Sequence, residues 1–198
     1  LRTAPMIDCM IEYRIHGRGG QGNVAAAYLL AATAFEAGWY CQAFPAFGAE
    51  RRGAPVAAFV RADKAPIHLR SQIRTPDFLI VQDDTLLLDP KITAGLKADG
   101  GMLVNSTRSG EEIAEIFGCR ALSFDATAMA MAETGRPIPN TALLAALLAL
   151  TGQFPLSALA TAIKGRFQGD VLASNLSLIE HAAEAVPKDL WMKETTDA

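Results

Sequence analysis

The segment Gly17-Arg18-Gly19-Gly20-Gln21-Gly22 has the residue types and spacing of a turn that exposes backbone N–H groups. It follows a short run of alternating apolar residues, Ile11 to Ile15, and opens an Ala- and Leu-rich stretch, Asn23 to Ala37. A turn from a strand into a helix places several N–H groups at the positive end of the helix dipole, where a phosphate or another anion can bind. The glycines would equally permit a tight turn with close helix–strand packing. Because Arg18 and Gln21 add polar side chains to this loop, we favour contact with an anion or a partner.

The glycines also satisfy the dinucleotide-binding pattern G-x-G-x-x-G, through Gly17, Gly19 and Gly22. A site of that kind needs an acidic residue at the end of the second strand to hold a ribose hydroxyl. The second strand is expected at Trp39 to Phe44, and its end carries neither Asp nor Glu. A site for NAD(P) or FAD is therefore the less favoured interpretation, although a stand-alone nucleotide-binding protein remains an open alternative.

A second candidate segment is the connection Phe44-Pro45-Ala46-Phe47-Gly48-Ala49-Glu50-Arg51-Arg52-Gly53-Ala54-Pro55. Proline and glycine restrict the backbone, so we expect an ordered loop with a defined course. Arg51 and Arg52 offer planar guanidinium groups that suit phosphate or carboxylate, and Glu50 can hold one of them in place. The alternative is a surface loop with an ion pair of little energetic value. We favour function, because loops that follow the strands of an α/β sheet often form binding sites.

Together these two segments resemble the γ subunit or γ domain of the 2-oxoacid:acceptor oxidoreductases, the pyruvate:ferredoxin oxidoreductase family, which includes enzymes for phenylglyoxylate and indolepyruvate. In that family a G-x-G-G-Q-G turn follows the first strand, and a P-x-x-G-x-E-x-R-G-G stretch comes later. The matching residues are Gly17, Gly19, Gly20, Gln21 and Gly22 in the first motif and Pro45, Gly48, Glu50, Arg52 and Gly53 in the second. Ala54 replaces the last glycine of the pattern. The resemblance continues through Pro76 to Gln82 and Asn140, and so covers most of the chain.

The resemblance implies an accessory subunit of a multi-chain enzyme. In this family a 2-oxoacid is decarboxylated on thiamine diphosphate and Mg²⁺ held by other subunits, electrons leave through iron–sulfur clusters to ferredoxin or NAD, and the acyl group passes to coenzyme A. The present chain, with no catalytic residue of its own, would pack on the thiamine-diphosphate-binding and iron–sulfur subunits and help to bind coenzyme A. The residues expected to contact cofactor or subunits are Gly17, Arg18, Gly19, Gly20, Gln21, Gly22, Pro45, Gly48, Glu50, Arg51, Arg52 and Gly53. A purely structural module, whose glycine loop lies between subunits, is the other alternative.

The composition is that of a compact chain with partners. Its 198 residues fit a single γ-type domain, 1–198, that can bury a substantial core. The hydrophobic share is 51% and the charged share 20%, which indicates that partner chains cover part of the surface. A net charge of −3 gives no electrostatic basis for binding nucleic acid or an anionic membrane. No segment is long and apolar enough to span a bilayer, and no secretory leader is evident, so we expect a cytoplasmic location.

The cysteines and histidines give no sign of a metal centre or a nucleophile. The cysteines lie far apart and form no C-x-x-C pair: Cys9, Cys41 and Cys119. We expect reduced structural thiols, and no metal site or iron–sulfur cluster made by this chain alone. The histidines show no Ser/His/Asp or Cys/His arrangement, so we expect structural roles for His16, His68 and His181.

To position these groups, the chain must alternate strands and helices. Strands are expected at Ile11–Ile15, Trp39–Phe44, Val56–Arg61, Asp77–Gln82, Gly101–Asn105 and Ala121–Phe124, with a short edge piece at Ile67–Leu69. Helices are expected at Asn23–Ala37, Leu86–Leu88, Thr127–Glu133, Asn140–Leu150, Leu156–Lys164 and Val171–Ala185, with one more after Ser109. Asp84, Ser109 and Asn140 are expected to cap helices, and Trp191 to lie on a tail against a neighbouring subunit. The predicted fold is α/β and Rossmann-like, with a mostly parallel sheet, helices on both faces and a helical C-terminal part.

Overall fold

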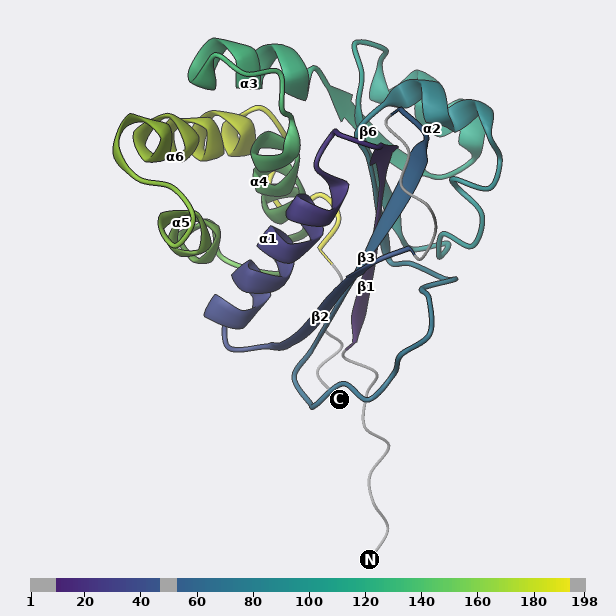
Figure 1. The fold of residues 1–198 in the computed structure, drawn as a ribbon. Helices are drawn as coiled ribbons and strands as arrows, with labels where there is room; N and C mark the ends of the chain where they lie inside the picture. The colour runs from purple at the N-terminus through teal and green to yellow at the C-terminus, as the bar shows by residue number, and fades with distance from the viewer. Residues whose placement is uncertain (1–9, 47–52, 193–198) are drawn as a thin grey trace, which may run out of the picture.

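The computed structural model describes residues 10–46 and 53–192, which form a six-stranded sheet flanked by helices (Figure 1). The strands are β1 (Ile11–Arg18), β2 (Tyr40–Pro45), β3 (Pro55–Asp63), β4 (Phe78–Val81), β5 (Gly101–Asn105) and β6 (Arg120–Phe124). The helices are α1 (Asn23–Glu36), the 3₁₀ helix η1 (Asp84–Leu88), α2 (Gly110–Phe117), α3 (Ala126–Thr134), α4 (Asn140–Thr151), α5 (Leu156–Lys164) and α6 (Gly169–Glu184). The elements expected from the sequence are thus present, apart from the edge piece.

The strand order is β2-β3-β1-β4-β5-β6. Strands β1, β4, β5 and β6 pair in parallel, whereas β3 pairs antiparallel with both β1 and β2. The connection between β2 and β3 is too short for the crossover helix that parallel neighbours need, so these two strands form a hairpin. The prediction of a mostly parallel sheet is confirmed, with β3 as the reversed strand.

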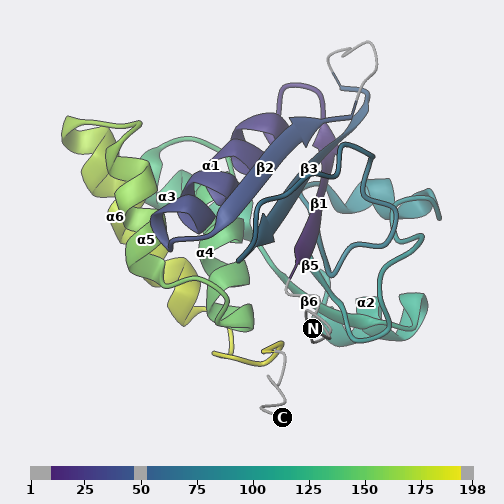
Figure 2. The same cartoon turned by 90° about the horizontal axis from the view of Figure 1, so that it is seen from below.

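Helices cover both faces of the sheet, as predicted (Figures 1 and 2). Helices α1 and α3 to α6 lie on one side, and η1 and α2 lie on the other. The buried strand β4 shows why: Phe78 and Ile80 pack into the core under α1 and α4, while Leu79 and Val81 pack with Ile113 of α2. A strand covered on both faces reads as a continuous apolar run rather than an alternating one.

Helix α4 is buried along almost its whole length. Its sequence is apolar on every side, and it packs against α1, α3, α5 and α6 as well as the sheet. A helix that is hydrophobic all round belongs in the interior of a protein. Part of the high apolar content of the chain is therefore used inside this subunit. No helix in the described ranges is long and apolar enough to cross a membrane.

Three local predictions were wrong. Residues 67–69 form no strand; the Ile67 carbonyl accepts a hydrogen bond from the Gln42 side chain instead of joining the ladder of β2. Asp83, not Asp84, caps η1, because its carboxylate accepts from the Thr85 N–H. Asn140 does not cap α4, since Pro139 holds that position and Asn140 donates across to Gly22. The capping role of Ser109 is confirmed by its bond from the Glu112 N–H.

The C-terminal segment closes the core rather than reaching toward a neighbour. Trp191 is 2% exposed, its ring stacks on Phe78 with the centroids 6.3 Å apart, and its backbone N–H donates to the Leu150 carbonyl. A Cβ on Gly101, at the start of β5, would lie 2.7 Å from the indole ring, so the glycine makes room for it. The expectation that Trp191 lies on a tail against a neighbouring subunit was therefore wrong, because the indole fills the base of this subunit's own sheet.

Candidate functional site

The glycine turn joins the end of β1 to the start of α1, as the sequence predicts. Gly20 and Gly22 have φ values of +95° and +79°, a left-handed conformation that favours glycine. A Cβ on Gly22 would also lie 2.6 Å from the Asn140 amide nitrogen, and one on Gly17 would lie 2.2 Å from the Asn23 amide oxygen. Around Gly20, by contrast, no atom lies within 4 Å of that position. Gly17 and Gly22 therefore serve internal packing, and Gly20 is the glycine open to a ligand or a partner.

Arg18 is held by groups of the protein itself. Its Nε donates to the Asp83 carboxylate at 2.9 Å, its Nη2 to Thr85 Oγ1 at 2.7 Å and its Nη1 to the Gly53 carbonyl at 3.1 Å. Partial burial by itself raises the pKa of the Asp83 carboxyl, but the hydrogen bonds from Thr85, Arg18 and Gln21 outweigh it and lower the pKa. The charge of Arg18 is thus balanced by an ionised carboxylate at the end of β4.

Gln21 is also held inside the turn. Its side-chain oxygen accepts from the Arg18 N–H at 2.6 Å, and its amide nitrogen donates to Asp83 at 3.3 Å. Arg18 and Gln21, the polar side chains expected to bind an anion, are therefore already hydrogen-bonded within the protein. The groups that remain for a ligand are backbone N–H groups of the turn and of the first turn of α1, around a small pocket lined by Arg18, Gly19, Gly20, Asn23 and Val24.

The structure brings the two sequence motifs together. The Gly19 N–H donates to the Ala54 carbonyl at 2.8 Å, and the Gly53 N–H donates to the Gly19 carbonyl at 3.0 Å. These bonds continue the antiparallel β1–β3 ladder into the glycine turn. Pro45 lies one strand farther out, opposite Ala58. The remaining predicted contact residues, Gly48, Glu50, Arg51 and Arg52, lie outside the described residues.

A polar pocket of about 430 Å³ lies where the parallel strands end, the usual ligand crevice of such sheets. Its walls come from the glycine turn, the ends of β4 and β5, and the segment before α4. Asp83 and Asp84 line it, and no Lys, Arg or His among the described residues does. The buried Gln82 amide at this edge has no hydrogen-bond partner in the described chain. The crevice is therefore acidic and rich in amides, which suits neutral or cationic groups better than phosphate.

The sequence-based reasoning missed a second polar site on β1. Alternate residues of this strand, Glu12, Arg14, His16 and Arg18, share one face, and the even spacing in the sequence was the available signal. Arg14 is buried, donates from Nε to His16 Nε2 at 2.9 Å, and donates from Nη2 to the carbonyls of Ile92 and Ala94 at 2.8 Å each. Burial, reinforced by Arg14 and opposed by Asp89, lowers the pKa of His16 to about 3. His16 is therefore a neutral acceptor.

Neither metal ligation nor thiol chemistry is indicated in the described ranges. No group of three or more His, Cys, Asp and Glu side chains there could hold a metal ion. Burial raises the pKa of the Cys41 and Cys119 thiols, which keeps them protonated and unreactive at neutral pH. Cys9 lies outside the described residues.

Comparison with known proteins gives a match along most of the chain. Residues 12–185 match the family described as "Pyruvate ferredoxin/flavodoxin oxidoreductase". The "Pyruvate/ketoisovalerate oxidoreductases common subunit gamma" of Pyrococcus abyssi is 47% identical over 178 residues, covering 88% of this chain and 96% of that protein. The "Pyruvate synthase subunit PorC" of Methanosarcina barkeri is 50% identical over 155 residues, covering 78% and 85%.

Solved structures agree with these sequence matches. The pyruvate oxidoreductase subunit PORC of Thermotoga maritima superposes with a TM-score of 0.79 at 39% identity, over 88% of this chain and 96% of that one. A 2-oxoglutarate:ferredoxin oxidoreductase of Magnetococcus marinus, solved with 2-oxoglutarate, coenzyme A and succinyl-CoA bound, shares the fold with a TM-score of 0.72 at 22% identity. That match covers 90% of this chain but 32% of the larger one.

Proposed function

The chain belongs to the pyruvate ferredoxin/flavodoxin oxidoreductase family, and we propose that it is the γ subunit of a complex that converts a 2-oxoacid and coenzyme A to acyl-CoA, CO₂ and a reduced acceptor. The observation that carries this proposal is the match along nearly the whole length of proteins named as γ subunits. In this proposal residues 1–198 act as one γ-type domain of a cytoplasmic hetero-oligomer. The subunit is not itself catalytic, and it packs on the subunits that are.

The redox chemistry is assigned to the partner subunits. Thiamine diphosphate with Mg²⁺ on those subunits would supply the decarboxylation chemistry, and iron–sulfur clusters would supply electron transfer to ferredoxin or NAD. The cysteines of this chain support placing the clusters on other subunits, because the three lie far apart in the sequence and lack the spacing of a cluster motif. The γ subunit contributes contact surface and part of the approach to the active site.

We further propose that the glycine turn and the following loop contact coenzyme A. The supporting geometry is the open position at Gly20, next to the N-terminal turn of α1, where backbone N–H groups and the helix dipole favour a phosphate. Arg18 contributes little free charge, because Asp83 neutralises it. The cations that remain in this part of the sequence are Arg51 and Arg52.

Substitution of Arg51 and Arg52 by Ala tests this contact. In the intact complex the double variant should raise the apparent KM for coenzyme A about tenfold, because charge-assisted bonds to phosphate are lost. The KM for the 2-oxoacid should stay unchanged, and Arg70→Ala, an exposed arginine elsewhere, serves as the charge control. An unchanged KM for coenzyme A would make the loop a contact between subunits instead.

Anaerobic purification of the tagged chain from its native cell tests the proposed function as a whole. The expected product is a brown complex with broad iron–sulfur absorbance, larger subunits and bound thiamine diphosphate. A set of 2-oxoacids, assayed with coenzyme A and an electron acceptor, would then identify the substrate. A colourless chain that purifies alone would reject the γ-subunit proposal.

A further inference from the structure

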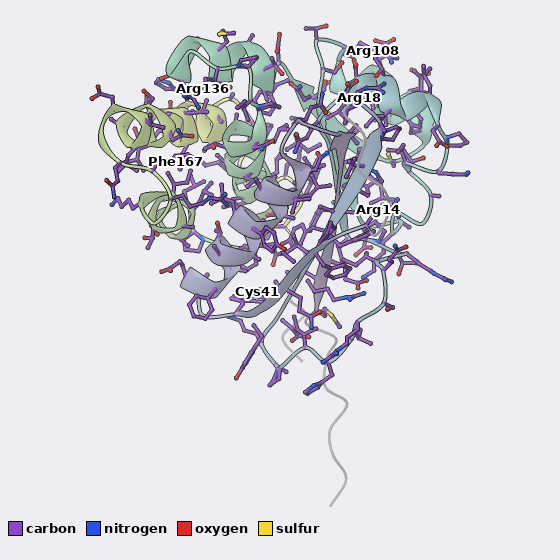
Figure 3. The ribbon with its side chains drawn as sticks, in the orientation of Figure 1. Arg14, Arg18, Cys41, Arg108, Arg136 and Phe167 are labelled. Carbon is purple, nitrogen blue, oxygen red and sulfur yellow. The ribbon has the colours of Figure 1, made fainter. Side chains whose placement is uncertain are left out.

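A cationic pocket lies on the face of the sheet opposite α1 and α4. Its volume is about 450 Å³, and it is bounded by β1, β3, the segment around Ile73 and the turn from Lys91 to Gly95. Figure 3 shows Arg14 on this side of the sheet, below Arg18 and away from the helical layer that carries Arg136 and Phe167. The pocket is separate from both the acidic crevice and the glycine turn.

Arg14, at the floor of this pocket, is a buried cation without a carboxylate partner. It is 7% exposed, and its partners, the His16 ring nitrogen and the carbonyls of Ile92 and Ala94, are all neutral. Its Nη1, which carries two of the five guanidinium N–H donors, makes no hydrogen bond to any described residue. A buried charge is costly unless an opposite charge accompanies it. Arg14 therefore offers a positive charge and a guanidinium nitrogen that is free to donate to an anion.

Two more cations line the same pocket. Arg74 and Lys91 are exposed, and neither forms an ion pair within the described ranges. His16 is neutral and adds no charge, while Asp89, the carboxylate whose field reaches His16, is exposed and accepts the Lys91 backbone N–H. No carboxylate of the described chain lines the pocket itself. Three positive charges therefore face one space.

The walls that carry these cations are fixed against each other. Gly95 has a φ of +78°, and a Cβ there would lie 2.1 Å from the Arg74 carbonyl oxygen, so the two backbones are in direct contact. Ile73 and Ile92, which flank the cations in the sequence, are 3% and 6% exposed. Arg14 itself ties the turn to β1 through two carbonyls. The cationic pocket is thus formed before any ligand arrives, which lowers the entropic cost of binding.

We propose that the cationic pocket binds a phosphoryl anion, either a phosphate ester or a pyrophosphate. A group with two or more negative charges matches three cations better than a single carboxylate does, and the planar guanidinium groups suit phosphate oxygens. The phosphate can come from a nucleotide-bearing ligand or from free phosphate. The site rests on Arg14, Arg74 and Lys91 alone; only the choice of coenzyme A as the natural source would rest on the proposed function.

Titration calorimetry on the purified assembly that contains this chain tests the proposal, with three probes. Inorganic pyrophosphate and adenosine 3′,5′-bisphosphate should bind, and adenosine, which lacks phosphate, should bind at least about tenfold more weakly than the bisphosphate. Tighter binding of the bisphosphate than of pyrophosphate would identify a nucleotide source, and the reverse order would identify free phosphate. Failure of both phosphate probes to bind at millimolar concentration would overturn the proposal.

The double variant Arg74→Gln, Lys91→Gln should weaken binding of both phosphate probes about tenfold, with a shallower dependence on salt. The matched control Arg70→Gln, Lys188→Gln removes the same charge from exposed positions outside the pocket and should leave binding unchanged. Equal binding by the two double variants would contradict the proposal. Arg14→Lys keeps the buried charge but loses the planar guanidinium group, and should also weaken binding of both phosphate probes. If the Arg14→Lys protein does not fold, the two double variants at exposed positions still test the proposal. The calorimetric measurement of pyrophosphate binding requires no enzymatic turnover. Its outcome therefore tests the cationic pocket whether or not the assembly is an oxidoreductase.

Discussion

Arg18 and Arg14 lie on the same face of β1, four residues apart, yet their surroundings are opposite. Arg18 belongs to a conspicuous glycine motif, and its charge is balanced by Asp83. Arg14 sits in an unremarkable strand, and its charge meets neutral acceptors. The motif marks where the backbone makes a special turn, whereas an available charge depends on what the rest of the fold brings to each side chain. A conspicuous sequence motif and an unsatisfied group therefore need not coincide.

The largest expected effect concerns the glycine turn as a packing element. Gly22→Ala should lower the free energy of unfolding by about 2–3 kcal/mol, because it combines left-handed strain with displacement of the Asn140 side chain. Gly20→Ala should cost about 1 kcal/mol, since only the strain applies there. Urea unfolding of both variants measures the difference. Equal losses would show that the region around Gly20 is as closely packed as that around Gly22.

The next largest expected effect is a pH dependence of stability that comes from His16, the neutral acceptor beside Arg14. The pKa of His16 is lowered in the folded chain, so below the ordinary value of about 6.5 the unfolded chain takes up a proton that the folded chain does not. Stability should be complete above that pH and fall by about 1 kcal/mol between pH 7 and 5.5. His16→Gln, which keeps a neutral acceptor for Arg14, should lack this loss. Parallel pH profiles of the two proteins would instead mean that His16 titrates in the folded chain with the same pKa as in the unfolded chain.

The smallest effect concerns the Arg18–Asp83 pair. Its side chains are 35% and 19% exposed, so a double-mutant cycle with Arg18→Gln and Asp83→Asn should give a coupling energy of only about 0.5–1 kcal/mol. The lowered pKa of Asp83 means that this stabilisation is present above the ordinary carboxyl pKa and fades as the pH falls below about 4. A coupling energy near zero at pH 7 would mean that the pair contributes no net stability, and would weaken the contrast with Arg14.

Much of the fold follows from local patterns. The apolar run of β4, the glycine turn into α1 and the helix cap at Ser109 are short-range signals that the structure confirms. Prediction was wrong where a distant residue decides the outcome. Asn140 resembles a cap, but Gly22 lies close enough to take its amide. Residues 67–69 have strand-forming types, but Gln42 bonds the Ile67 carbonyl from its side chain.

The candidate site could also be predicted only in part: its loops follow from the motifs, but the partners of its side chains do not. The sequence motifs mark the loops that contain Gly19 and Gly53 as candidate sites. The antiparallel pairing of β1 with β3 then brings these two loops together. That Asp83 would neutralise Arg18 could not be foreseen, because it depends on the parallel neighbour β4 ending beside the turn. The cationic pocket depends on loops far along the chain folding back over β1, and no spacing in the sequence encodes that contact.

The burial of Trp191 has a consequence for how the subunit is made. Synthesis on the ribosome proceeds from the N-terminus, so the sheet and most of its helices emerge before this indole does. Until then the base of the sheet, around Phe78 and Gly101, lacks the ring that fills it. The nascent chain therefore has a gap in its core at that end until Trp191 has left the ribosome, and a chain cut short before Trp191 would keep that gap.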